Sequence, residues 1–234
     1  MLRLAAFLAA MAAPAAADGV ASARYDEPTT RYAHGVLGDA VEWGALVLET
    51  ETGRKVRVRL PENRVFEDTK PRVVDIDGDG DAEVIAVESD QRLGARLSVY
   101  GADGLVASGE FIGRSFRWLA PVGIGAADLD GDGQIEFAYV DRPHLAKTLR
   151  ILRQDGKRLV LVASLEGVTN HRIGESDIAG GIRDCGAGPE MIVAKANWSQ
   201  VVAVTFDGQG FETRVLGPHE GRGTFADAMS CNLN

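Results

Sequence analysis

Four dipeptides typical of tight hairpin turns recur along the sequence at nearly equal intervals. They are Thr52-Gly53, Asp103-Gly104, Asp155-Gly156 and Asp207-Gly208, and each lies between two runs rich in apolar residues. Their glycines are 51, 52 and 52 residues apart. A regular spacing of this length predicts an array of repeated units, each built from short strands. No helical periodicity in the sequence competes with this interpretation.

One unit can be followed from residue 72 onward. Residues 73–74 lead into an acidic loop, residues 84–87 form a continuous apolar run suited to a strand buried on both faces, and residues 97–100 and 105–111 flank a hairpin turn. Four strands per unit and a period near 52 residues predict an all-β fold, a small β-propeller of about four blades with four antiparallel strands each.

The two ends of the chain suggest how such a ring closes. Residues 44–60 resemble the last two strands of a unit, and residues 223–234 resemble the opening of one. We therefore expect N- and C-terminal strands to share a closing blade, with five blades as an alternative if residues 32–41 supply more strand.

The composition limits the classes of partner. An apolar content of 45% is sufficient for a core, and a net charge of -9 argues against a nucleic-acid partner. Two segments, residues 75–83 and 128–136, contain five and four carboxylates, which together equal the whole net negative charge.

The first seventeen residues have the features of a signal peptide, with Arg3, an apolar stretch over residues 4–13 and small residues at 15–17. We expect residues 18–43 to form an N-terminal segment and residues 44–234 the propeller. The mature protein is then secreted or periplasmic and monomeric, with no membrane span. An uncleaved anchor is the alternative, although the apolar stretch is shorter than the roughly 20 residues that a span requires.

The two cysteines, Cys185 and Cys231, would meet an oxidising compartment after export, where a disulfide persists. The alternative is two small buried side chains. Neither cysteine lies in a CxxC pair or near a histidine, so the sequence gives little support for zinc or redox chemistry.

The two acidic segments repeat one pattern, DIDGDGDAE at residues 75–83 and DLDGDGQIE at residues 128–136. Carboxylates at positions 1, 3, 5 and 9 face inward if the chain coils tightly, glycines at positions 4 and 6 permit that coil, and the carbonyl of Asp81 or Gln134 adds an oxygen. An all-oxygen cage suits calcium better than magnesium. A solvated acidic turn is the alternative. An EF-hand is excluded because position 12 is Ala86 in one copy and Tyr139 in the other.

This motif, followed by an apolar strand in units of about 52 residues, resembles the FG-GAP or VCBS repeats of integrin-alpha-like propellers over residues 44–230. The resemblance implies a calcium-stabilised propeller with two calcium sites, used as an adhesion or binding module for an unknown protein or glycan. It assigns metal ligands at Asp75, Asp77, Asp79, Asp81, Glu83, Asp128, Asp130, Asp132, Gln134 and Glu136.

The third copy departs from the pattern. Its five ligand positions are Ile182, Asp184, Gly186, Gly188 and Glu190, which retain two carboxylates, so we expect no ion there. Because Cys185 lies in this loop, a disulfide could replace the metal as the local cross-link.

The loops on the face opposite the acidic segments each contain an arginine. We consider an axial funnel for an anionic ligand, formed by Arg64, Arg114, Arg117, His171, Arg172, His219 and Arg222. The alternative is that these arginines pair with nearby acids such as Glu67, Glu175 and Glu220. A rival function is a propeller-fold hydrolase or lyase acting on an anionic saccharide, with His171 and Glu175 as an acid-base pair. No nucleophile or nucleotide motif supports it.

Overall fold

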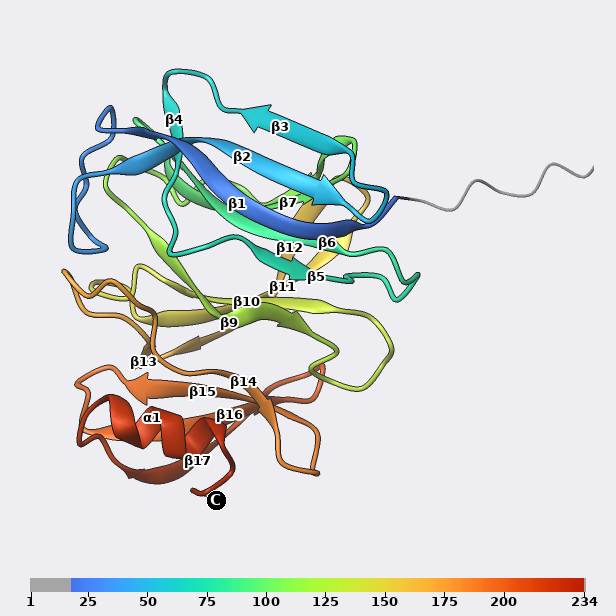
Figure 1. The fold of residues 1–234 in the computed structure, drawn as a ribbon. Helices are drawn as coiled ribbons and strands as arrows, with labels where there is room; N and C mark the ends of the chain where they lie inside the picture. The colour runs from blue at the N-terminus through green and yellow to red at the C-terminus, as the bar shows by residue number, and fades with distance from the viewer. Residues whose placement is uncertain (1–17, 234) are drawn as a thin grey trace, which may run out of the picture.

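Strands dominate the computed structural model, which describes residues 18–233 (Figure 1). The predicted signal peptide lies outside these residues. Within them, seventeen strands and one helix confirm the predicted all-β class. No helix of the described part is long and apolar enough to cross a membrane.

The strands form four antiparallel meanders that follow one another along the chain. The first meander contains β1 (Val20–Thr29), β2 (Glu42–Thr50) and β3 (Lys55–Arg59). The second contains β4 (Arg64–Phe66), β5 (Arg72–Val74), β6 (Glu83–Asp90), β7 (Gly94–Gly101) and β8 (Gly104–Ser108), with β4 and β5 one after the other along the same edge of β6.

The remaining two meanders repeat this order. The third contains β9 (Leu119–Ala127), β10 (Glu136–Asp141), β11 (Thr148–Asp155) and β12 (Arg158–Glu166). The fourth contains β13 (Val168–Thr169), β14 (Gly181–Asp184), β15 (Pro189–Lys195), β16 (Gln200–Phe206) and β17 (Phe211–Pro218), with β13 and β14 both on β15. All four predicted turns connect consecutive antiparallel strands of one meander.

Single residue pairs connect the first three meanders. Trp43 pairs with Phe66 between the first and second, and Ser108 pairs with Arg158 in parallel between the second and third. These links produce one curled sheet of twelve strands, while the fourth meander is a separate sheet of five. The meanders therefore meet mainly through side chains.

Alternation along the second strand of the later meanders creates the core. In β6, Val84 and Ala86 pack toward the first meander, whereas Ile85 and Val87 pack toward the third. A strand of this kind is apolar at every position because both of its faces are covered. The same alternation recurs in β10 and β15, so three apolar layers hold the four meanders together.

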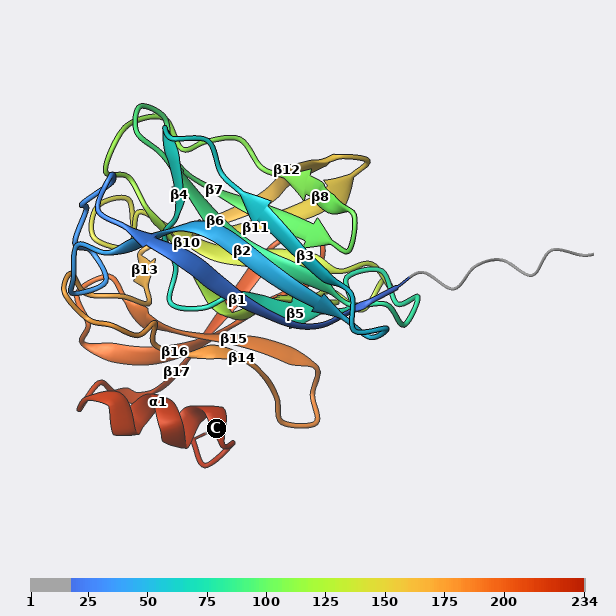
Figure 2. The same ribbon diagram turned by 45° about the horizontal axis from the view of Figure 1, so that its top comes forward.

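The two end meanders cover their outer faces differently. On the first, Arg57 and Arg59 of β3 form ion pairs with Asp26 and Glu27 of β1. On the fourth, α1 (Arg222–Met229) lies beside the sheet that contains β14 to β17 (Figure 2). Its Phe225 and Ala228 pack against apolar residues of β15 and β16. Each end of the stack thus has its own cover.

The C-terminal end corrects one expectation: the segment there forms α1 on the fourth meander, so the predicted closing strand is wrong. At the other end, residues 20–29 of the expected N-terminal segment form β1 and pair with β2. In α1, Phe225 and Ala228 pack on β15 and β16, and the sequence pattern did not predict this contact.

A pair of loops nevertheless bridges the first and fourth meanders. The Gly174 N–H donates to the carbonyl oxygen of Val36 at 2.9 Å, and a Cβ on Gly38 would lie 2.9 Å from the Gly174 oxygen. Val36 is buried and belongs to the apolar layer between the second and third meanders. The β1–β2 loop therefore reaches across two meanders to contact the β13–β14 loop.

Candidate metal centre

The loop at residues 75–83 connects β5 to β6 and is held in a tight coil by its own carboxylates. Asp75 accepts hydrogen bonds from the N–H groups of Gly78 at 2.7 Å and Gly80 at 3.0 Å. Both glycines have positive φ, which a side chain would disfavour. The Glu83 carboxylate folds back to accept from the Ile76 N–H at 3.3 Å. The coil predicted from the glycine spacing is thereby formed.

The loop at residues 128–136 connects β9 to β10 and repeats this hydrogen bonding. Asp128 accepts from Gly131 at 2.8 Å and Gly133 at 3.1 Å, and Glu136 accepts from the Leu129 N–H at 2.8 Å. The two loops therefore have the same backbone scaffold, fixed by equivalent residues.

Carboxylate oxygens converge in both loops. One oxygen each from Asp75, Asp77 and Asp79 lies within 4.8 Å of the others, as does one each from Asp128, Asp130 and Glu136. The side chains at position 7 point elsewhere: Asp81 accepts from the Gly19 N–H at 3.1 Å, and Gln134 donates to Asp132 at 3.1 Å.

Electrostatics distinguishes the two loops. Burial, together with the nearby carboxylates of Asp77, Asp79 and Asp75, raises the pKa of Glu83 to about 7. No Lys or Arg of the described chain forms an ion pair with the carboxylates of residues 75–83. In the other loop the Arg153 guanidinium contacts Asp130 at 2.5 Å, Asp132 at 3.0 Å and Glu136 at 2.6 Å.

The third copy connects β14 to β15 and contains a disulfide. Cys185 is bonded to Cys231, which follows α1, and the bridge spans 46 residues of sequence. Asp184 still accepts from the N–H groups of Gly186 at 2.7 Å and Gly188 at 3.1 Å, so part of the coil survives without the other acids. Glu190 forms ion pairs with Arg183 at 2.8 Å and with Arg214.

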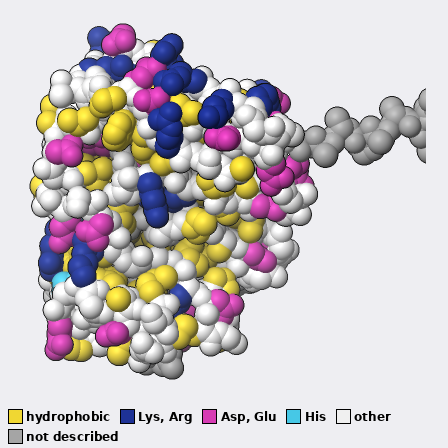
Figure 3. Space-filling view, in the orientation of Figure 1, with side chains coloured by type: hydrophobic (Ala, Val, Ile, Leu, Met, Phe, Trp, Pro, Cys, Tyr) yellow, Lys and Arg dark blue, Asp and Glu magenta, His cyan; other side chains and the backbone are white. Residues whose placement is uncertain are grey.

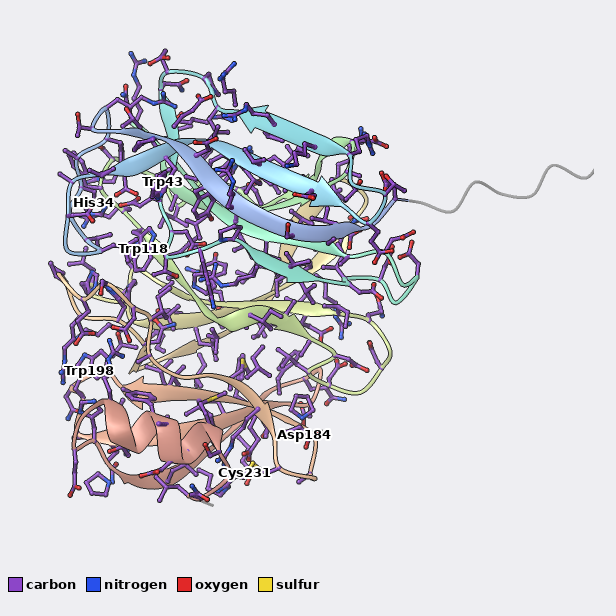
Figure 4. The ribbon with its side chains drawn as sticks, viewed as in Figure 1. His34, Trp43, Trp118, Asp184, Trp198 and Cys231 are labelled. Atoms are coloured by element: carbon purple, nitrogen blue, oxygen red, sulfur yellow. A yellow bond between two sulfur atoms is a disulfide. The ribbon has the colours of Figure 1, made fainter. Side chains whose placement is uncertain are left out.

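The acidic loops and the arginine-bearing loops lie at opposite ends of the strands. Figure 4 shows His34 and Trp198 near one edge of the molecule, and Asp184 and Cys231 toward the other. In Figure 3 acidic side chains gather along the right-hand edge.

The predicted funnel is not a single site. Arg64 lies over the Phe111 ring and near Glu88 and Asp90, away from the other candidates. Arg114 is exposed, and Arg117 lines a hollow of only about 20 Å³ with His34 and His144.

The remaining funnel residues pack around Trp198 and Glu175. Arg172 stacks over the Trp198 ring at 4.2 Å, and the His219 ring lies 5.2 Å from it. Arg222 pairs with Glu175 at 2.6 Å and with Asp177 at 2.9 Å. Local pairing thus accounts for Arg222, as the alternative interpretation expected.

His171 does not form the acid-base pair considered from sequence. Its side chain is fully buried, with Nε2 2.8 Å from the backbone oxygen of Glu175 and Nδ1 2.9 Å from Nε2 of His144. Burial lowers the pKa of His171. Because the His171 imidazole is neutral and has no access to solvent, it packs within the core and is poorly placed to transfer a proton to a substrate.

Sequence reasoning missed a cleft between the second, third and fourth meanders. It has a volume of about 670 Å³ and is lined by Lys70, Arg72, Ile124, Asp177 and Ile178, among others. Arg72 is buried and donates to Asp68 and to the Gly123 carbonyl oxygen, so it fixes the wall of the cleft. The residues come from β5, β9 and the segment before β14, and no local sequence pattern connects them.

Comparison with protein families gives one match. The FG-GAP-like repeat family matches residues 75–139, which include both acidic loops, the strands β6 to β9 and the first part of β10. No curated protein and no solved structure matches the chain. The predicted resemblance is confirmed over this segment: the protein contains an FG-GAP-like repeat at residues 75–139.

Proposed function

We propose that the protein is an exported, calcium-stabilised binding module. The observation that carries this proposal is the loop at residues 75–83, where carboxylates of Asp75, Asp77 and Asp79 converge and no Lys or Arg of the described chain forms an ion pair with them. Like charges at such short range repel strongly unless a cation neutralises them. The proposed calcium is structural, because the loop connects the two paired strands β5 and β6.

The donor set fits this ion. Carboxylates of Asp75, Asp77 and Asp79 converge within 4.8 Å, and Glu83 lies in the same coil. The Asp81 side chain is engaged with Gly19, which leaves its backbone carbonyl as the donor at that position. Calcium accepts six to eight oxygens in flexible geometry, whereas magnesium requires stricter geometry. Bound calcium would offset part of the negative charge of the loop and cross-link the β5–β6 connection.

The remaining parts of the proposal rest on the fold. We assign the four meanders as blades, because β5 contacts both β1 and β9, and β9 contacts β14, as inner strands would.

The disulfide is compatible with export to an oxidising compartment. The cleft of about 670 Å³ fits a binding role best, since its volume is typical of ligand sites and its lining combines apolar residues with polar and charged ones.

Calorimetric titration of the purified protein with calcium tests the proposal. We expect heat of binding with an affinity near 10⁻⁴ to 10⁻³ M, the range of extracellular modules, and weaker binding of magnesium. The double variant Asp75→Asn/Asp79→Asn should lose this binding. Asp103→Asn is the matched control, because Asp103 is an acid whose side chain is 97% exposed in a hairpin turn. Equal heats from the double variant and the control would refute the assignment, as would no uptake at millimolar calcium.

A further inference from the structure

The two acidic loops have the same backbone scaffold and differ in one contact, the guanidinium of Arg153. This side chain extends from β11, where Arg153 is the cross-strand partner of Glu136. It lies 2.5 Å from Asp130 and 2.6 Å from Glu136, two of the three residues whose oxygens converge in that loop. A positive charge of the chain itself therefore occupies the acidic cradle.

The residue beside the first loop that is equivalent to Arg153 is a glycine, which has no side chain to place there. Gly101 of β7 lies against Glu83, and a Cβ built on Gly101 would be 4.0 Å from the Glu83 Cγ. The fourth meander has the opposite arrangement, because Glu190 is paired with both Arg183 and Arg214. The three copies thus differ in how many guanidinium groups contact the glutamate at position 9: none, one and two.

A guanidinium and a calcium ion compete for the same oxygens. The nitrogen atoms of Arg153 lie at hydrogen-bond distance from Asp130 and Glu136, so calcium has to displace the guanidinium to use the lone pairs that it occupies. A route exists, since Arg153 also lines a hollow of about 300 Å³ between the two loops, with Asp77, Gln134 and Gln154.

We propose that Arg153 serves as an internal cation for the loop at residues 128–136, so that calcium fills the loop at residues 75–83 first. The second loop is then a weak site that takes calcium only when Arg153 moves out. This inference rests on the proposed function, and it replaces two equivalent calcium sites by two sites of different affinity.

The test measures the second loop by itself. In the Asp75→Asn/Asp79→Asn background, calcium binding is titrated by calorimetry with Arg153 intact and with Arg153→Gln. We expect Arg153→Gln to tighten binding about tenfold or more, because charge-assisted hydrogen bonds no longer have to be broken. Arg150→Gln is the matched control: Arg150 lies on the same strand but pairs with Asp141. It removes the same charge and should leave the affinity unchanged.

A stability measurement accompanies the titration, because Arg153→Gln leaves carboxylates without their partner. We expect the variant to melt at a lower temperature in chelator and to recover in millimolar calcium. An unchanged affinity of Arg153→Gln, or equal tightening by Arg150→Gln, would overturn the inference. Two calcium sites of equal affinity in the unmodified protein would also overturn it. Absence of calcium binding by the unmodified protein and by Arg153→Gln would instead refute the proposed function itself.

Discussion

The loops at residues 75–83 and 184–190 occupy the same place in their meanders but are stabilised in different ways. The first gathers five carboxylates and has no ion pair with any Lys or Arg in residues 18–233. The second retains two acids, and it is tied by a disulfide and by arginine pairs on Glu190. The backbone coil at the start of each loop is nevertheless similar, since Asp75 and Asp184 both accept hydrogen bonds from following glycines.

On the function proposed above, the same strand connection is cross-linked by different chemical means, by calcium in the first loop and by the disulfide with arginine pairs in the second. A loop stabilised by a metal ion should respond to a chelator and not to a reductant. The loop that is tied covalently and by arginine should respond in the opposite way. Four measurements test this distinction.

The largest effect is expected for Arg183→Gln. Arg183 is buried, pairs with Glu190 and donates to the Ala228 and Leu233 carbonyl oxygens, so it holds the end of α1. Removing one partner of a buried pair costs about 3–5 kcal/mol of unfolding free energy. Denaturant unfolding measures it, and Arg214→Gln, whose side chain is 45% exposed, should cost about 1 kcal/mol or less. Recovery of Arg183→Gln by calcium would contradict the comparison.

Loss of the disulfide comes next. The Cys185→Ser/Cys231→Ser variant opens a covalent loop of 46 residues and should be less stable by about 2–4 kcal/mol. The same loss is expected with chelator and with calcium, since the loop contains no predicted ion. Denaturant unfolding under both conditions provides the check, and a loss seen only in chelator would link the two loops.

Calcium removal should have a somewhat smaller effect. At a hundredfold excess over the dissociation constant, a ligand of the folded state contributes about 2.7 kcal/mol. For a chain of this size, chelation should lower the melting temperature by roughly 5–10 °C. The Asp75→Asn/Asp79→Asn variant should lose this response, and the cysteine variant should keep it. A cysteine variant that no longer responds to chelator would remove the distinction.

The smallest effect concerns pH. Burial and neighbouring carboxylates raise the pKa of Glu83 from 4.5 to about 7, so in chelator the folded protein binds more protons than the unfolded chain in this interval. Its unfolding free energy therefore falls as pH rises from 4.5 to 7. Although burial opposes it, hydrogen bonds from Arg214 and Arg183 lower the pKa of Glu190, so that group contributes stability above pH 4.5 that is lost in acid.

Glu83→Gln should remove the unfavourable part of this dependence. We expect the variant in chelator to be more stable than the unmodified protein at pH 7.5 by about 1 kcal/mol, and nearly equal at pH 4.5. Melting curves at the two pH values measure the difference. Asp103→Asn again serves as the control for charge removal, and an equal gain from it would contradict the explanation.

The repeated parts of this molecule are readable from its sequence. The four turn dipeptides occur where strands reverse, the apolar runs of β6, β10 and β15 are buried, and the cysteines are bonded as expected. The turns and the apolar runs are local features, so spacing and residue type are sufficient to predict them. The acidic coils belong to the same class, because their hydrogen bonds join residues only a few positions apart.

Features that depend on register or packing were not readable. Arg153 becomes a neighbour of Glu136 only through the pairing of β10 with β11, whose connection includes Arg142 and Lys147 at positive φ and follows no simple turn rule. The helix α1 has no side-chain N-cap and only two buried residues, Phe225 and Ala228, so packing decides its conformation. The predicted funnel also depended on packing. Arg172 stacks on Trp198 and Arg222 pairs with Glu175, so these two arginines do not converge with the other funnel residues on one site.

The reach of the β1–β2 loop has a consequence for the length of this array. The bond from Gly174 to Val36 closes only when two meanders separate the loops that carry them. Inserting another meander would place Gly174 too far from Val36 for this hydrogen bond. Deleting a meander would require the β1–β2 loop to adopt another conformation. The fixed length of the β1–β2 loop, residues 30–41, therefore limits how many meanders this chain can gain or lose while it keeps the hydrogen bond between Gly174 and Val36.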